Sequence, residues 1–148
     1  MSDKLKVLFL CTGNSCRSQM AEGWTRQLKG AVIEAYSAGI ETHGLDPRAV
    51  KVMAEAGVDI SRHQSQHLDA FIHVKLDVVV TVCGAAHEAC PLFPGTTTVI
   101  HVGFDDPPKM AQERAMQGAS EEEQLACYRT VRDEISAFCQ TLPEALST

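Results

Sequence analysis

The segment at positions 11–18, CTGNSCRS, constrains the fold of this chain more than any other, because it joins an apolar strand to a helix through a tight turn. The run 7–11 predicts a buried strand, and a helix is expected over 15–29. In such a strand–turn–helix unit, backbone N–H groups face inward and form a concave cradle for an oxyanion. Gly13 is expected to supply the positive φ that the turn needs, and Asn14 is the next most tolerant residue. The segment therefore predicts an anion site at the carboxyl end of the first strand.

Cys11 and Arg17 bracket five residues of this cradle. Arg17 presents a planar fork of donors that matches a tetrahedral oxyanion. Cys11 lies beneath the anion, where the same donors and the helix N-terminus favour thiolate over thiol. We predict that Cys11 is a nucleophile, rather than a buried structural thiol beside a surface arginine. The predicted oxyanion-binding residues are Thr12, Gly13, Asn14, Ser15, Cys16, Arg17 and Ser18.

Strands and helices alternate along the 148 residues, a length that suits one domain over 1–148. Further strands are expected over 32–37, 76–82 and 96–102, further helices over 46–57 and from residue 120 onward, and a long loop over 103–119. The order predicts an α/β fold with a four-stranded parallel sheet and helices on both faces. Ligands bind at the carboxyl ends of strands in such folds, and Cys11 and Cys83 both fall there.

Cys83 ends an apolar strand, and Cys90 follows seven positions later. If the intervening residues are helical, a rise of ~1.5 Å per residue puts the two Cα atoms ~10 Å apart. A disulfide needs about 7 Å or less, so a bridge between them would require that helix to unwind. Two buried thiols are one alternative, and zinc ligation with His87 and His101 is another. The spacing argues against zinc, and we predict no metal site there.

Asp105 lies in the segment 103–107, GFDDP, directly after the fourth expected strand. A carboxyl group at that strand end can reach the cradle of the first strand and donate a proton to a leaving oxygen. The alternative is a helix cap or a turn, where Asp before Pro is common. Because the cradle is present, we predict that Asp105 is a general acid.

Composition excludes some partners. The formal net charge is −6, which disfavours nucleic acid and anionic membranes, and the chain has no apolar run of about 18 residues. Six cysteines without a secretory signal indicate redox or nucleophilic chemistry in the cytoplasm rather than a disulfide framework.

Taken together, these strings resemble the low-molecular-weight protein tyrosine phosphatase fold, and more closely the thioredoxin-coupled arsenate reductases built on it. The resemblance is carried by residues 11–23, 36–44, the Cys83/Cys90 pair and 103–107. It implies a three-layer sandwich, present as a monomer, that reduces arsenate to arsenite in arsenic detoxification and has weak phosphatase activity. It also implies that thioredoxin is the electron donor and that no organic cofactor is needed.

The resemblance further assigns roles to single residues. Cys11 would be the nucleophile, Arg17 the oxyanion clamp, Asp105 the acid, and Cys83 and Cys90 the relay thiols. The remaining implied roles are that Ser18 hydrogen-bonds the Cys11 thiolate and that Asn14 holds the loop. His63 could tune the Cys83 thiolate in such enzymes, but a histidine at such a place is more often an ordinary loop residue.

Some family members hold a potassium ion near Asn14, Glu22 and Ser37. Gln66 stands here where they carry an acidic residue, which argues against the ion. The alternative functions are a tyrosine phosphatase without a relay and a non-catalytic oxyanion-binding or redox-sensing module. Pro107, Pro108 and Lys109, which follow Asp106, supply none of the aromatic side chains that would wall a phosphotyrosine.

Overall fold

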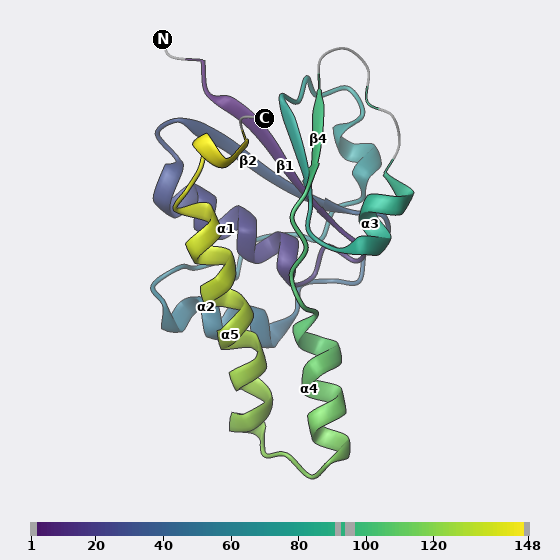
Figure 1. The fold of residues 1–148 in the computed structure, drawn as a ribbon, viewed down its shortest axis with the longest axis vertical. Helices are drawn as coiled ribbons and strands as arrows, with labels where there is room; N and C mark the ends of the chain where they lie inside the picture. The colour runs from purple at the N-terminus through teal and green to yellow at the C-terminus, as the bar shows by residue number, and fades with distance from the viewer. Residues whose placement is uncertain (1–2, 91–92, 94–96, 147–148) are drawn as a thin grey trace.

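The computed structural model describes residues 3–90, 93 and 97–146. Its four strands form one parallel sheet in the order β2-β1-β3-β4 (Figure 1). The strands are β1 (Leu5–Cys11), β2 (Ile33–Gly39), β3 (Val78–Thr81) and β4 (Thr98–His101). The four-stranded parallel sheet expected from the sequence is confirmed, and the strand expected over 96–102 begins at a residue that lies outside the described ones.

Helices connect these strands and cover the sheet. They are α1 (Arg17–Lys29), α2 (Pro47–Glu55), η1 (Leu68–Phe71), α3 (Gly84–Ala89), α4 (Pro107–Met116), α5 (Glu121–Cys139) and η2 (Glu144–Leu146). Helix α1 packs against β1 and β2, α3 contacts β1 and β3, and α2 packs against α5. The last long helix, α5, packs against α1.

Local signals in the sequence explain where two helices begin. Asp46 caps α2 by accepting a hydrogen bond from the Arg48 N–H at 2.9 Å, and Pro47 follows it at the first helical position. Ser120 and Glu123 form a reciprocal capping box at the start of α5. Both helix starts are as predicted.

Residues 103–119 contain a helix where we expected a long loop. In α4, Asp106 is the N-cap and Pro107 the first helical residue, the same dipeptide signal that opens α2. Gly118 follows the helix with φ of 87°, which suits glycine. Two consecutive prolines at the helix start suggested a loop, yet proline is well tolerated in a first turn because its missing N–H needs no partner there. With α5, α4 forms a hairpin that extends beyond the sheet (Figure 1).

The sheet order brings Cys11 and Cys83 to one edge. In β1 the side chains of residues 7–10 are fully buried, as expected for a strand covered on both faces. Leu10 of β1 is paired with Thr81 of β3, so Cys11, the last residue of β1, and Cys83, two residues after β3, lie at the carboxyl ends of adjacent strands. Helix α3 begins directly after Cys83, which confirms the helical segment expected between Cys83 and Cys90.

Candidate active site

The loop between β1 and α1 is shaped by Asn14, which is fully buried and has φ of 48°. Its side-chain Nδ2 donates to Ser18 Oγ at 2.9 Å, and its Oδ1 accepts from the Gln66 N–H at 2.7 Å and from Gln19 Nε2 at 3.1 Å. Asn14 therefore holds the loop, as the resemblance implied. Ser18 is paired with Asn14, and the described residues show no hydrogen bond from Ser18 to Cys11.

Gly13 is needed for space and not for a positive φ, so our expectation for its backbone was wrong. The left-handed residue of the loop is Asn14. A Cβ atom at Gly13 would lie 2.2 Å from Nδ1 of His43, far inside van der Waals contact. The His43 N–H donates to the Gly13 carbonyl at 2.9 Å, which fixes the imidazole over the loop. Sequence reasoning missed His43, because a close approach between residues 30 positions apart leaves no local signal.

A cavity of about 250 Å³ opens above Cys11. Arg17, Asp106, Pro108 and His43 form part of its wall together with the loop. Of the predicted oxyanion-binding residues, Thr12, Gly13, Ser15, Cys16 and Arg17 line the cavity, whereas Asn14 and Ser18 lie buried behind it. The cavity has the volume for a small tetrahedral anion beside a thiol and a guanidinium.

Arg17 is held from the segment that follows β4. Its Nη1 donates to the Phe104 carbonyl at 3.0 Å, and its Nη2 lies 3.7 Å from Asp106 Oδ2. Asp105 is exposed and does not line the cavity. The carboxyl group that the structure brings to the cradle is thus Asp106, one residue after the predicted acid. Asp106 is the N-cap of α4 and lies beside the cradle. Because we expected a loop and not a helix start at this position, the sequence did not indicate which of the two aspartates faces the cradle.

Cys11 and Cys83 are both buried thiols in hydrogen-bond contact. The Cys11 thiol donates to Cys83, and with the Thr12 hydroxyl at 3.2 Å from Cys83 Sγ this lowers the pKa of Cys83 to about 5. The same contact and burial raise the pKa of Cys11, although Arg17 opposes the shift. Two touching sulfurs resist a double negative charge, so the pair holds one. The contact thus favours ionisation of Cys83 over Cys11, whereas we expected the thiolate at Cys11.

The remaining cysteines occupy other positions. Cys90 is half-buried at the end of α3, and burial raises its pKa. Cys16 is buried at the start of α1, where desolvation and the nearby Asp46 carboxylate hold its pKa well above the usual value. Cys127 and Cys139 are buried in α5.

His63 lies away from the cysteine pair. Its Nδ1 is 2.9 Å from Gln19 Oε1 and its Nε2 4.0 Å from Glu22 Oε2, and burial lowers its pKa. The described contacts therefore do not link His63 to Cys83, and its tuning role is not supported.

The residues near Glu22 do not fit a potassium ion. The Glu22 carboxylate is bonded by the Ser37 hydroxyl at 2.5 Å and by Arg26 Nη2 at 2.8 Å. Asn14 Oδ1 already accepts from the Gln66 backbone N–H and from Gln19 Nε2. A guanidinium already balances the buried charge. More widely, the part of the chain that the structure describes contains no cluster of three metal-ligating side chains.

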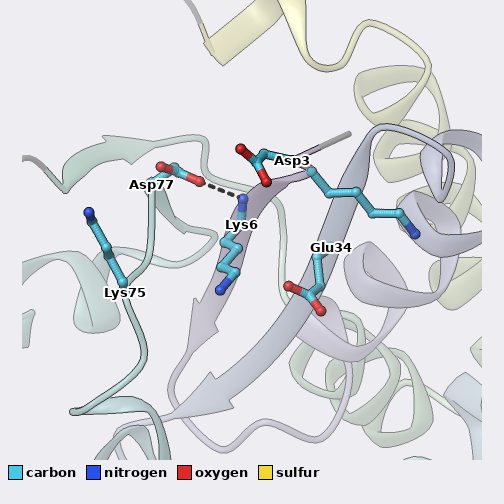
Figure 2. A pocket seen from close by; sticks show the side chains of 6 residues that line it. Asp3, Lys6, Glu34, Lys75 and Asp77 are labelled. Atoms are coloured by element: carbon cyan, nitrogen blue, oxygen red, sulfur yellow. Dashed lines mark hydrogen bonds between the residues drawn. The ribbon is translucent and has the colours of Figure 1, made fainter. Parts of the chain in front are cut away.

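A second hollow, of about 510 Å³, lies at the opposite end of the sheet (Figure 2). Lys6, Glu34 and Asp77 near the amino ends of the strands give it both signs of charge, and the Lys6 N–H donates to Asp77 at 2.8 Å. It contains no nucleophile, so the cavity above Cys11 is the candidate active site. Among the described residues, no helix has the length and apolar character to cross a bilayer.

Comparisons with known proteins show what this chain is similar to. Residues 6–148 match the family described as low molecular weight phosphotyrosine protein phosphatase. An arsenate reductase of Halalkalibacterium halodurans is 47% identical over 142 residues, which is 96% of this chain and 97% of that protein. A solved arsenate reductase in a phosphate-binding state is 30% identical with a TM-score of 0.71, covering 97% of this chain and 99% of that one. A low molecular weight protein tyrosine phosphatase from T. tengcongensis is 26% identical with a TM-score of 0.73, covering 96% and 99%.

Proposed function

This chain belongs to the low molecular weight phosphotyrosine protein phosphatase family, and from that premise we propose that it reduces arsenate to arsenite. One observation carries the proposal. Cys11, at the floor of an anion-sized cavity, touches Cys83, a second thiol poised as a thiolate. A phosphatase needs only the first thiol, whereas a reductase needs a second one that can attack the first.

The first step is a substitution at arsenic. The Cys11 thiol loses its proton, and its sulfur forms a bond to arsenic while an As–O bond breaks. The departing oxygen takes a proton and leaves as water, and Cys11 carries a thiol-bound arsenate. Arg17 and the loop N–H groups bind the remaining oxygens.

Asp106 is our candidate for the proton donor in this step. It lines the cavity and lies 3.7 Å from Arg17, whereas Asp105 is exposed outside the cavity. A donor must reach the leaving oxygen, so position favours Asp106 over the predicted Asp105.

Two thiol exchanges complete the reduction. The Cys83 thiolate attacks the Cys11 sulfur, the electron pair of the As–S bond stays on arsenic, and arsenite leaves. Cys90 then loses its proton and attacks Cys83, which gives a Cys83–Cys90 disulfide and returns Cys11 as a thiolate. Arsenic gains two electrons and the two relay thiols lose them. Thioredoxin, a dithiol protein, reduces the final disulfide.

Phosphate-ester hydrolysis is a weak side activity of the same site. Cys11, Arg17 and Asp106 provide the nucleophile, clamp and acid that hydrolysis needs. The described residues that line the cavity include no Phe, Tyr or Trp side chain that would pack against the ring of an aromatic ester.

Arsenite production by the purified protein with thioredoxin and its reductase tests the proposal. Cys11→Ser is expected to lose arsenate reduction and p-nitrophenyl phosphate hydrolysis, and Cys83→Ser only the reduction. Without reductant, Cys90→Ser should release about one arsenite per molecule and stop as a Cys11–Cys83 disulfide, identified by mass spectrometry. Loss of ester hydrolysis in a folded Cys90→Ser variant would contradict these separate roles.

A further inference from the structure

Thr81, the last residue of β3, is fully buried and its hydroxyl lies between two imidazoles. Its Oγ1 is 3.1 Å from Nδ1 of His87 in α3 and 2.9 Å from Nδ1 of His101 in β4. The ring centroids are 4.7 Å apart and the planes are tilted by 37°. The cluster therefore ties one turn of a helix to two strands of the sheet.

The Thr81 hydroxyl can make a hydrogen bond to both imidazoles at the same time. A hydroxyl has one hydrogen and can also accept, so Thr81 donates to one Nδ1 and accepts from the protonated Nδ1 of the other ring. Two neutral imidazoles in opposite tautomers meet this requirement. The only other partner of Thr81 Oγ1 among the described residues is the Ile100 carbonyl, at a longer 3.5 Å.

Helix α3 has few other contacts that would hold it. It has six residues, too short for a helix to be stable alone, and only Ala86 is buried. At its carboxyl end, the hydrogen bond from the Cys90 N–H to the His87 carbonyl is long at 3.4 Å. The His87 side chain therefore provides a polar tether from α3 to the sheet.

We propose that His87, Thr81 and His101 form a latch that holds α3 helical and thereby sets how readily Cys83 and Cys90 form a disulfide. The effect of the latch on disulfide formation rests on the Cys11–Cys83–Cys90 relay proposed above. A helical α3 keeps the two Cα atoms ~10 Å apart, so the disulfide requires unwinding, which draws His87 away from Thr81. The latch acts in the dithiol form alone. In the relay, the Cys11–Cys83 disulfide oxidises Cys90 by thiol exchange and is itself reduced at Cys11. The Cys83–Cys90 disulfide therefore forms without any further oxidant.

The test compares His87→Ala with Glu88→Ala, a matched change at an exposed residue of the same helix. Each full-length protein is equilibrated in dithiothreitol redox buffers, and the Cys83–Cys90 disulfide is quantified by mass spectrometry. Loss of one hydrogen bond to the dithiol form should raise the equilibrium constant for disulfide formation roughly three- to tenfold in His87→Ala. Tenfold corresponds to a potential about 30 mV more negative. Glu88→Ala should match the wild type.

Two further variants separate the latch from a general effect on folding. His87→Asn keeps an amide near the position of Nδ1 and is expected to recover most of the wild-type constant. His101→Ala should shift the constant in the same direction, and the His87/His101 double variant should shift it by less than the product of the two single changes. Additive changes would overturn a shared role through Thr81.

Hydrogen exchange on the reduced proteins tests the latch without any redox step. His87→Ala should accelerate exchange at residues 84–90 and leave β1 and β3 unchanged, and Glu88→Ala should do neither. Exchange and disulfide constants equal to the Glu88→Ala control would overturn the latch. If the wild type never forms the Cys83–Cys90 disulfide, the relay and the latch's redox role both fail, whereas faster exchange would still support its hold on α3.

Discussion

Neighbouring aspartates at residues 105 and 106 differ in what they can reach. Asp106 caps α4 and lies beside Arg17, whereas Asp105 is exposed. A single position along the chain separates a carboxyl group in the cavity from one in solvent. Arg17 in turn is fixed by the Phe104 carbonyl, so the segment after β4 positions both the clamp and the candidate acid.

We expect Asp106→Asn to lower kcat for p-nitrophenyl phosphate roughly 10²–10⁴-fold, because the amide cannot protonate the leaving oxygen. Asp105→Asn is the matched control and should change kcat little. Affinity for phosphate as a competitive inhibitor should stay similar in both variants. Equal losses of kcat in the two variants would remove the acid role from Asp106.

Gly13 and His43 provide a second test at the scale of single residues. Gly13→Ala places a methyl group where the His43 ring lies, so the loop must shift and phosphate binding and hydrolysis should both fall at least tenfold. The double variant Gly13→Ala/His43→Gly removes the obstructing ring and should recover part of the loss. Calorimetric titration with phosphate measures this. Failure of the double variant to bind better than Gly13→Ala would show that the glycine is needed for another reason.

At the scale of elements, α3 is the part of the fold that the relay must reshape. Oxidation to the Cys83–Cys90 disulfide should unwind it, and hydrogen exchange should become faster within residues 84–90 while the sheet keeps its protection. Limited proteolysis should cleave the oxidised form in the same segment. Equal exchange in the two redox states, with the disulfide verified by mass spectrometry, would mean that the relay proceeds without helix opening.

Some elements of the fold could be predicted from the sequence, and others could not. The apolar runs at 7–11 and 76–82 and the Asp46–Pro47 start were sufficient to predict the parallel sheet and α2. The same Asp–Pro signal at 106–107 was not recognised as a helix start, and this concealed the direction of Asp106. The His43 and His87 contacts depend on tertiary packing between distant segments, which no local pattern encodes. The Cys11–Cys83 contact, which raises the pKa of Cys11, depends on tertiary packing in the same way.

At the scale of the whole molecule, the outer helix α5 supports the cradle. The Tyr128 hydroxyl donates to Asp46 Oδ2 at 2.7 Å, and the Asp46 N–H donates to the Ser15 carbonyl in the loop at 3.0 Å. Burial and this carboxylate raise the pKa of Tyr128, which keeps its hydroxyl protonated and able to donate. A helix more than 100 positions from the loop therefore contributes to its shape.

Stability should depend on pH through Cys83. Its pKa falls from 9.0 to about 5 on folding, so the unfolded chain binds an extra proton between these values. The resulting stabilisation is complete near pH 9 and is lost as the pH falls through about 5. In denaturant titrations under reducing conditions, the unfolding free energy of the wild type relative to Cys83→Ser should rise from about pH 5 to 9.

Cys90→Ser is the control, because burial raises the pKa of Cys90 instead of lowering it. Its difference from the wild type should not grow over the same range. A constant difference for Cys83→Ser would show that Cys83 is not ionised in the native state.

The pairing of Leu10 with Thr81 has a consequence for protein engineering. Any phosphatase that shares this register has a position two residues after the second strand that lies beside its nucleophile, so a thiol introduced there would contact the nucleophile without a change in the backbone. A further thiol about two helical turns after the introduced one would form the final disulfide, which an external dithiol can reduce. Two substitutions could thus turn a hydrolase scaffold into a reductase, and the difficult remainder would be a connecting helix weak enough to open.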